Sequence, residues 1–211
     1  NCAFASSQML YQRSELYCLT HEEISEYYTD EDKKMMRASS ATEAQLFEND
    51  TLEESVFFAK EMGVKKSDSL FIGLANEAHF CAQYFKNEGL DVQSVCCKVC
   101  SVDKDLLELE KIKPGQREAM CNPKVQARLL NEGGTELNFI VGLCVGHDML
   151  FTMESKVPVS SIITKTGFLA NNPAGAVYSR YWRRKLGILE EGTDKKIFFY
   201  ESLSLMRQTF L

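Results

Sequence analysis

The sequence lacks the long apolar runs and the nucleotide-binding loops that mark several large classes of protein. Its longest uncharged apolar runs, such as residues 138–145, are far shorter than the ~20 residues that a membrane-spanning helix needs. No basic n-region followed by an apolar h-region stands near the beginning of the sequence. Neither G-x-G-x-x-G nor G-x-x-x-x-G-K-[ST] occurs, so a nucleotide site of known type is unsupported. We therefore expect a soluble, untargeted protein with no membrane partner.

The sequence also lacks the excess of positive charge that a nucleic-acid partner requires. Its net charge is −6, and this imbalance lies entirely in residues 1–50, where ten acidic residues face four basic ones. Backbone binding to nucleic acid needs a basic face. The single basic run lies at residues 180–185 and is typical of the end of a helix before Gly187. We expect no nucleic-acid partner.

Cysteine is too sparse for a scaffold built from disulfides, with eight in 211 residues. A chain of this size can bury a core without such crosslinks, which favours a reducing compartment. Cys96 and Cys97 are adjacent and Cys100 follows closely. This grouping indicates a cluster of thiols that serves metal binding, redox chemistry or nucleophilic attack.

From residue 52 onward, strand-like and helix-like segments alternate, which is typical of an α/β domain. We expect a Rossmann-like or flavodoxin-like, mostly parallel sheet of four to five strands with helices on both faces and a helical N-terminal appendage. The expected strands are residues 69–75, 91–97, 137–143 and 157–164. Two Asn-Pro pairs, at Asn122 and Asn172, have the form of helix starts, with Asn as N-cap and Pro in the first turn.

Three regions are expected along the chain. Residues 1–50 form an acidic helical appendage, and residues 51–187 form the α/β domain. Residues 188–211 are an apolar tail that packs on the domain or on a partner. If the partner is a second copy of the chain, the protein is a homo-oligomer through this tail.

Unusual side chains follow the expected strands at their carboxyl ends, where open parallel sheets place their ligand sites. These residues come from three strand ends and one helix start, and we expect them to line one rim of the sheet. The set is Cys97, Lys98, Cys100, Cys121, Asn122, Cys144, His147, Asp148 and Asn172.

Four stretches of the sequence resemble one known family, the uncharacterised metal-binding proteins with domain of unknown function 1847 (DUF1847). They are SVCCKVC, EAMCNPKVQARLLN, LNFIVGLCVGHDMLF and KVPVSSIITKTGFLANNPAGAVY, and the resemblance covers roughly residues 55–186. The resemblance implies a cytoplasmic α/β protein with a bound metal and no assigned reaction.

The residues at the rim allow three interpretations, and the first is a metal site. Zinc or an iron–sulfur cluster needs about four soft ligands. Five candidates are present: Cys97, Cys100, Cys121, Cys144 and His147. A second site that includes Cys2, Cys18 and His21 is also open, although a loose pair of cysteines there is an equal alternative.

The second interpretation is a cysteine-dependent enzyme. Gly142-x-Cys144-x-Gly146 has the spacing of a nucleophile elbow, in which glycines permit a sharp turn before a helix. Cys144 would be the nucleophile and His147 its base. GLCVGHD also resembles the elbow of class I glutamine amidotransferases, but that chemistry needs a downstream histidine, and none follows His147.

The third interpretation is binding without catalysis. Helix N-termini favour anions, and Lys98, Asn122, Asp148 and Asn172 would be the contacts of a small anionic ligand. The asparagines and Asp148 have an alternative role as helix caps alone. Together the sequence favours a cytoplasmic protein whose Cys/His-lined pocket holds a metal ion or small anionic ligand and is redox-linked, with Cys144 catalysis as the alternative.

Overall fold

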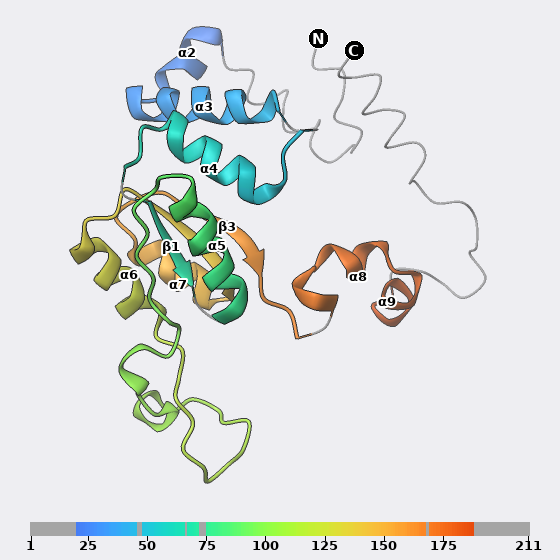
Figure 1. The fold of residues 1–211 in the computed structure, drawn as a ribbon. Coiled ribbons are helices and arrows are strands. Elements are labelled where there is room, and N and C mark those ends of the chain that lie inside the picture. Colours follow the sequence, from blue (N-terminus) through green and yellow to red (C-terminus); the bar gives the residue numbers. More distant parts are fainter. Residues whose placement is uncertain (1–19, 46–47, 66, 72–74, 168, 188–211) are drawn as a thin grey trace.

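A computed structural model describes residues 20–45, 48–65, 67–71, 75–167 and 169–187. Its central element is a parallel sheet of three strands in the order β1-β2-β3 (Figure 1). These are β1 (Ser67–Phe71), β2 (Leu137–Leu143) and β3 (Val159–Thr164). In the register, Ser67 pairs with Leu137, and Asn138 pairs with Val159.

Helices α4 (Thr51–Glu61) and α5 (Ala75–Asn87) share one core with the sheet. Helices α6 (Pro123–Gly133) and α7 (His147–Glu154) share a second core with it. All seven residues of β2 are buried, because this strand lies between its two neighbours and is covered on both faces.

The alternation of side chains along β2 explains how it serves both cores. Leu137, Phe139 and Val141 belong to the core with α4 and α5, whereas Ile140 belongs to the core with α6 and α7. Gly142 has a positive φ of 81°, and the pairing with β3 shifts register around it. Leu143 therefore joins the same core as Ile140.

The expected sheet of four to five strands with a Rossmann-like or flavodoxin-like order is wrong. The described residues form a sheet of three strands. The expected strand at residues 91–97 is an irregular segment, although Val92 is buried in the core. The carbonyl oxygen of Val95 accepts a hydrogen bond from Gln126 Nε2 at 3.0 Å, so a helix side chain takes the place of a strand partner.

Residues 98–120 leave the body as a lobe between this irregular segment and α6 (Figure 1). It contains short 3₁₀ helices at Val99–Ser101 and Lys104–Leu107. Its two ends are joined by hydrogen bonds from Met120 N to Val102 O and from Lys104 N to Glu118 O, at 2.8 and 3.0 Å.

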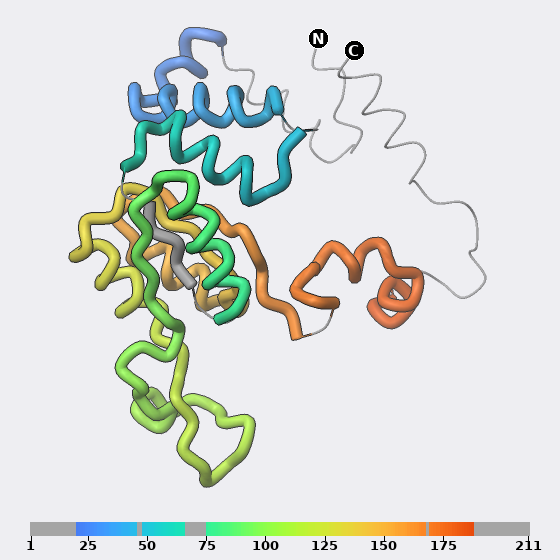
Figure 2. Tube along the Cα trace, viewed as in Figure 1, coloured from blue at the N-terminus to red at the C-terminus, as the bar shows by residue number. Residues whose placement is uncertain are grey.

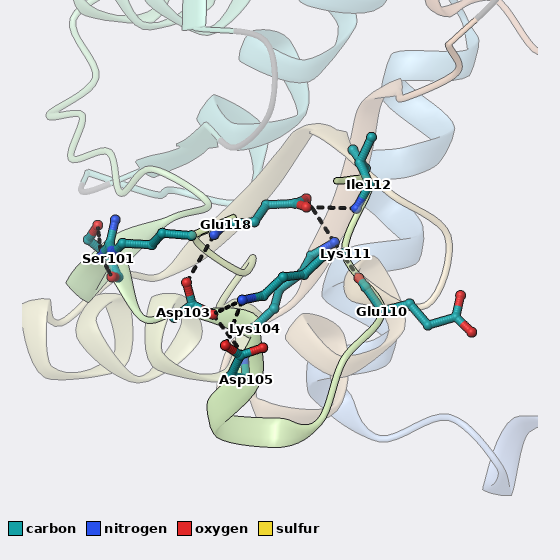
Figure 3. A network of polar contacts seen from close by, with 9 residues as sticks. Ser101, Asp103, Lys104, Asp105, Glu110, Lys111, Ile112 and Glu118 are labelled. Atoms are coloured by element: carbon teal, nitrogen blue, oxygen red, sulfur yellow. Dashed lines mark hydrogen bonds and ion pairs between the residues drawn. The ribbon is translucent and has the colours of Figure 1, made fainter. Parts of the chain in front are cut away.

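Ion pairs hold the lobe in place of an apolar core (Figure 3). Lys111 contacts Asp103 and Asp105 at 2.7 and 2.6 Å, and Lys104 contacts Glu118 at 2.8 Å. The Lys111 ammonium holds the pKa of the Asp103 carboxyl well below its usual range. This lobe is therefore a polar, locally closed unit of the chain.

Two helical segments lie apart from the sheet (Figures 1 and 2). Helices α2 (His21–Glu26) and α3 (Asp30–Glu43) precede the domain, and each begins with a capping box. After β3 come a 3₁₀ turn (Leu169–Asn171), α8 (Ala174–Tyr178) and α9 (Arg180–Lys185). The expected tail at 188–211 lies outside the described residues, and no helix among the described ones is long and apolar enough to span a membrane.

Candidate functional site

The carboxyl end of β2 is where most of the expected site residues meet. Helix α7 begins directly after β2, and α6, which leads back into β2, begins at the same edge. The connection from β2 to α7 turns at Gly142 and Gly146, whose φ angles are 81° and 87°. Glycine adopts such angles without the cost that a side chain would add. The turn places Cys144 and His147 at this edge.

Cys97 and Cys121 are in direct contact here, although 23 residues of lobe separate them in the sequence. The Asn122 amide donates a hydrogen bond to the Cys97 carbonyl at 2.7 Å, which fastens the two chain segments together. The side chains of Cys97 and Cys121 interact, and this interaction is the largest cause of the pKa shift of each thiol. The two thiols therefore stand at the neck of the lobe.

The interaction between the two side chains shifts the pKa values of Cys97 and Cys121 in opposite directions. It lowers the pKa of Cys121 to about 5, with help from the nearby His147 and Lys165 side chains. The same contact, together with burial, raises the pKa of Cys97 above its usual range. The two titrations are therefore linked, so that loss of the first proton from the pair is favoured and loss of the second is opposed.

His147 completes what we call the thiol cluster, defined as Cys97, Cys121 and His147. Its imidazole lies beside Cys121 and lowers the pKa of that thiol, and its Nδ1 atom is buried without a hydrogen-bond partner. A buried nitrogen of this kind is uncommon, because an unpaired polar atom costs desolvation free energy. His147 therefore keeps one nitrogen available to a ligand.

Lys165 is the cation beside the thiol cluster, and it is not among the site residues expected from the sequence. It follows β3 directly, and its amide donates to the Leu143 carbonyl at 3.3 Å. Its charge lowers the pKa values of both Cys97 and Cys121. Lys165 follows the carboxyl end of a parallel strand, the position at which ligand sites are expected, so the sequence did contain a signal for it.

Cys144 lies in the same turn but is not part of these thiol contacts. Its carbonyl accepts hydrogen bonds from the His147 and Asp148 amides at 3.0 and 3.2 Å, and its side chain is partly buried. The two positive φ angles of the turn belong to the flanking glycines and not to Cys144. A nucleophile elbow holds its nucleophile in a strained backbone. Catalysis by Cys144 stays a prediction.

The expected anion contacts lie in differing surroundings. The Asp148 side chain accepts hydrogen bonds from the Gly146 and Met149 amides, so it caps its own turn. Lys98 is exposed and lowers the pKa of Glu118 in the lobe. Asn122 precedes α6 with no side-chain cap bond. Asn172 is exposed in the segment before α8, where its amide donates to Leu169 O.

The structure also separates the expected metal ligands. Cys100 is exposed in the lobe, at a φ of 67°, whereas Cys97, Cys121 and His147 share the cluster. Among the described residues, no group of three or more His, Cys, Asp or Glu side chains is arranged to hold a metal ion. The donor types suit zinc, but their present arrangement does not form a complete metal site. Cys2 and Cys18 lie outside the described residues, and His21 is exposed on α2.

Comparisons with known proteins identify relatives without a known activity. Residues 12–162 match the model of a family described as "Protein of unknown function (DUF1847)". An uncharacterised protein of Methanocaldococcus jannaschii is 46% identical over 170 residues, which cover 80% of this chain and 88% of that protein. No solved structure matches the chain. The chain therefore belongs to the DUF1847 family of proteins of unknown function.

Proposed function

We propose that this chain is a cytoplasmic thiol protein that exchanges its Cys97–Cys121 dithiol with disulfides. The observation that carries the proposal is that the two cysteine side chains lie beside each other at the neck of the lobe, where their interaction shifts their pKa values in opposite directions. A thiolate next to a second thiol is the arrangement that thiol–disulfide exchange requires. The reducing cytoplasm expected from the free cysteines would keep the pair in its dithiol form.

The exchange proceeds in two steps. The Cys121 thiolate attacks one sulfur of a disulfide-bearing substrate, forming a mixed disulfide and releasing the other sulfur as a thiolate. Cys97 then loses its proton to the released thiolate and attacks the Cys121 sulfur of the mixed disulfide. The products are a Cys97–Cys121 disulfide and the substrate with both sulfurs reduced. Two electrons pass from the protein to the substrate, and the substrate gains one proton from the protein.

Neighbouring side chains support the assigned roles. Cys121 is the attacking residue because its pKa is lowered, whereas Cys97 keeps its proton until the second step. Lys165 and His147 stabilise the negative charge on Cys121. Both cysteines are partly buried, whereas Cys96 and Cys100 are exposed.

A redox titration tests this proposal. Protein equilibrated with mixtures of reduced and oxidised glutathione should form the Cys97–Cys121 disulfide, read by alkylation and peptide mapping. Trypsin cleaves after Lys98 and so separates Cys97 from Cys100. A Cys96→Ser variant resolves the adjacent pair and should still form the disulfide, whereas Cys97→Ser should stop at a glutathione adduct on Cys121. Oxidation of the exposed Cys96 and Cys100 to the same extent as Cys97 and Cys121 would contradict the proposal.

A second candidate function is the binding of a soft metal ion, such as zinc. The observation that favours it is the unpartnered, buried Nδ1 atom of His147, whose side chain lies beside Cys121. Cys97, Cys121 and His147 would hold the ion after a local rearrangement. Zinc added to the reduced protein should then protect both cysteines from alkylation at one equivalent per chain. Disulfide formation without such protection would leave dithiol exchange as the function.

A further inference from the structure

Helix α2 and the first turn of α3 form an acidic surface. Residues 21–32 contain six acidic side chains and no lysine or arginine. Every one of these residues is exposed, and α2 has no buried residue. Ile24, Tyr27 and Tyr28 are 44%, 73% and 40% exposed within this charged segment. The acidic surface thus combines negative charge with apolar and aromatic side chains, as interfaces commonly do.

Helices α8 and α9 form a segment of the opposite charge, which we call the basic arm (residues 177–186). It contains four lysine and arginine side chains and no acidic one. Val177, Tyr178, Tyr181 and Leu186 are 58 to 68% exposed. The two helices pack against each other and bury none of their residues. The basic arm therefore also presents apolar and aromatic surface to solvent.

The two surfaces lie far apart within one chain. In Figures 1 and 2, α2 lies beyond α3 and α4 from the sheet, whereas α8 and α9 extend from the end of β3. The acidic surface of one molecule consequently cannot contact the basic arm of the same molecule in this structure. Two molecules can bring them together.

We propose that the protein forms a homodimer in which each basic arm docks on the acidic surface of the other copy. A two-fold axis makes the two contacts identical, so that both arms and both acidic surfaces are used and the assembly closes. Opposite charges set the orientation, and the exposed tyrosines of both surfaces supply the apolar area. The contact does not involve the thiol cluster, so it is independent of the proposed function.

The test begins with the association constant of the full chain, measured by sedimentation equilibrium. Wild-type protein should be a dimer that weakens as salt rises from about 0.05 M to about 0.5 M, because salt screens exposed charges. Arg183→Glu with Lys185→Glu should weaken the dimer by about tenfold or more at low salt. A matched control, Lys86→Glu with Lys113→Glu, makes the same charge change at exposed residues outside both surfaces and should leave the dimer intact.

A charge-swap variant distinguishes the proposed contact from a folding defect. Glu22→Lys with Glu26→Lys reverses charge on the acidic surface and leaves its capping residues in place. Either reversal alone should weaken the dimer, whereas a chain that carries both should dimerise again. Far-UV circular dichroism reports whether each variant is folded. A monomeric wild type, or a combined variant that stays monomeric while folded, would overturn the proposal, as would a dimer unaffected by the arm reversal.

Discussion

Replacing Cys97 by alanine tests the contact on which the thiol cluster depends. The Cys97 thiol is the largest cause of the lowered Cys121 pKa, which falls from 9.0 to about 5. A hydrogen bond to a charged group contributes about 1.5 to 3 kcal/mol. Since one pKa unit corresponds to about 1.4 kcal/mol, Cys97→Ala should raise the midpoint of Cys121 ionisation by roughly one to two pH units.

The assay is the rate of Cys121 alkylation by iodoacetamide across a pH series, followed by peptide mass spectrometry. The midpoint is the readout, because a thiolate becomes intrinsically more nucleophilic as its pKa rises. The plateau rate at high pH should therefore increase by roughly 3- to 8-fold in Cys97→Ala. Cys97→Ser retains a hydroxyl donor at the same position and should shift the midpoint less than alanine does.

Two results would refute this reasoning. One is a wild-type midpoint near the usual value for cysteine, which would mean that Cys121 is not held as a thiolate. The other is the same midpoint in wild type and Cys97→Ala, which would mean that the Cys97 contact has no effect on Cys121. Cys100→Ala serves as the matched control, since Cys100 is exposed in the lobe and its removal should leave the profile unchanged.

Three further predictions concern the fold that supports the site. Phe85→Ala should reduce the free energy of unfolding by about 3 to 5 kcal/mol in urea denaturation, because Phe85 is fully buried against Phe139, whereas a change below about 1 kcal/mol would contradict its place in the core. Lys111→Met should speed amide hydrogen exchange in the lobe roughly threefold, because it removes the cation that pairs with Asp103. The contribution of the Asp103 carboxylate to stability is present at neutral pH and is lost as the pH falls through its lowered pKa. Unchanged exchange would mean that other contacts hold the lobe. Gly146→Ala should lower the free energy of unfolding by about 1 kcal/mol, measured by thermal denaturation. Space for a methyl group is present, but Gly146 has a φ of 87°, which strains a residue with a side chain. An unchanged Tm would show that the turn relaxes.

Several elements could be predicted from the sequence because their signals are local. Residues 137–143 are an uncharged run in which Asn138 is the single polar side chain, and the structure places β2 over the same residues. The Asn122-Pro123 pair marks the start of α6, since proline fits the first turn of a helix. The family assignment is confirmed as well, because it depends on short motifs that need no knowledge of the fold.

The errors occurred where tertiary contacts decide the outcome. Val92 and Val95 have the residue type of a strand, but a glutamine side chain from α6 takes the hydrogen bond that a strand partner would make. The predicted helix after Asn172 is two short helices, α8 and α9, because Ser179 has an extended backbone and caps the second one. Neither feature leaves a pattern in the local sequence.

The candidate site was predicted in its location more than in its contacts. The sequence predicted Cys97, Cys121 and His147 at one edge of the sheet, and in the structure Cys121 lies beside each of the other two side chains. It could not separate them from Cys100 and Cys144, because spacing along the chain does not show which thiols touch. The contact between Cys97 and Cys121 depends on the fold of the intervening lobe, which no sequence pattern indicated.

The most direct test of the central claim is to map the disulfide that forms when the reduced protein is treated with oxidised glutathione. The thiol cluster predicts one dominant crosslinked pair of peptides that joins Cys97 to Cys121, two hydrogens lighter than the separate thiols. This crosslink should persist when Cys96 and Cys100 are both replaced by serine. Free thiols at Cys97 and Cys121 after oxidation, or a dominant crosslink between other cysteines, would contradict the account.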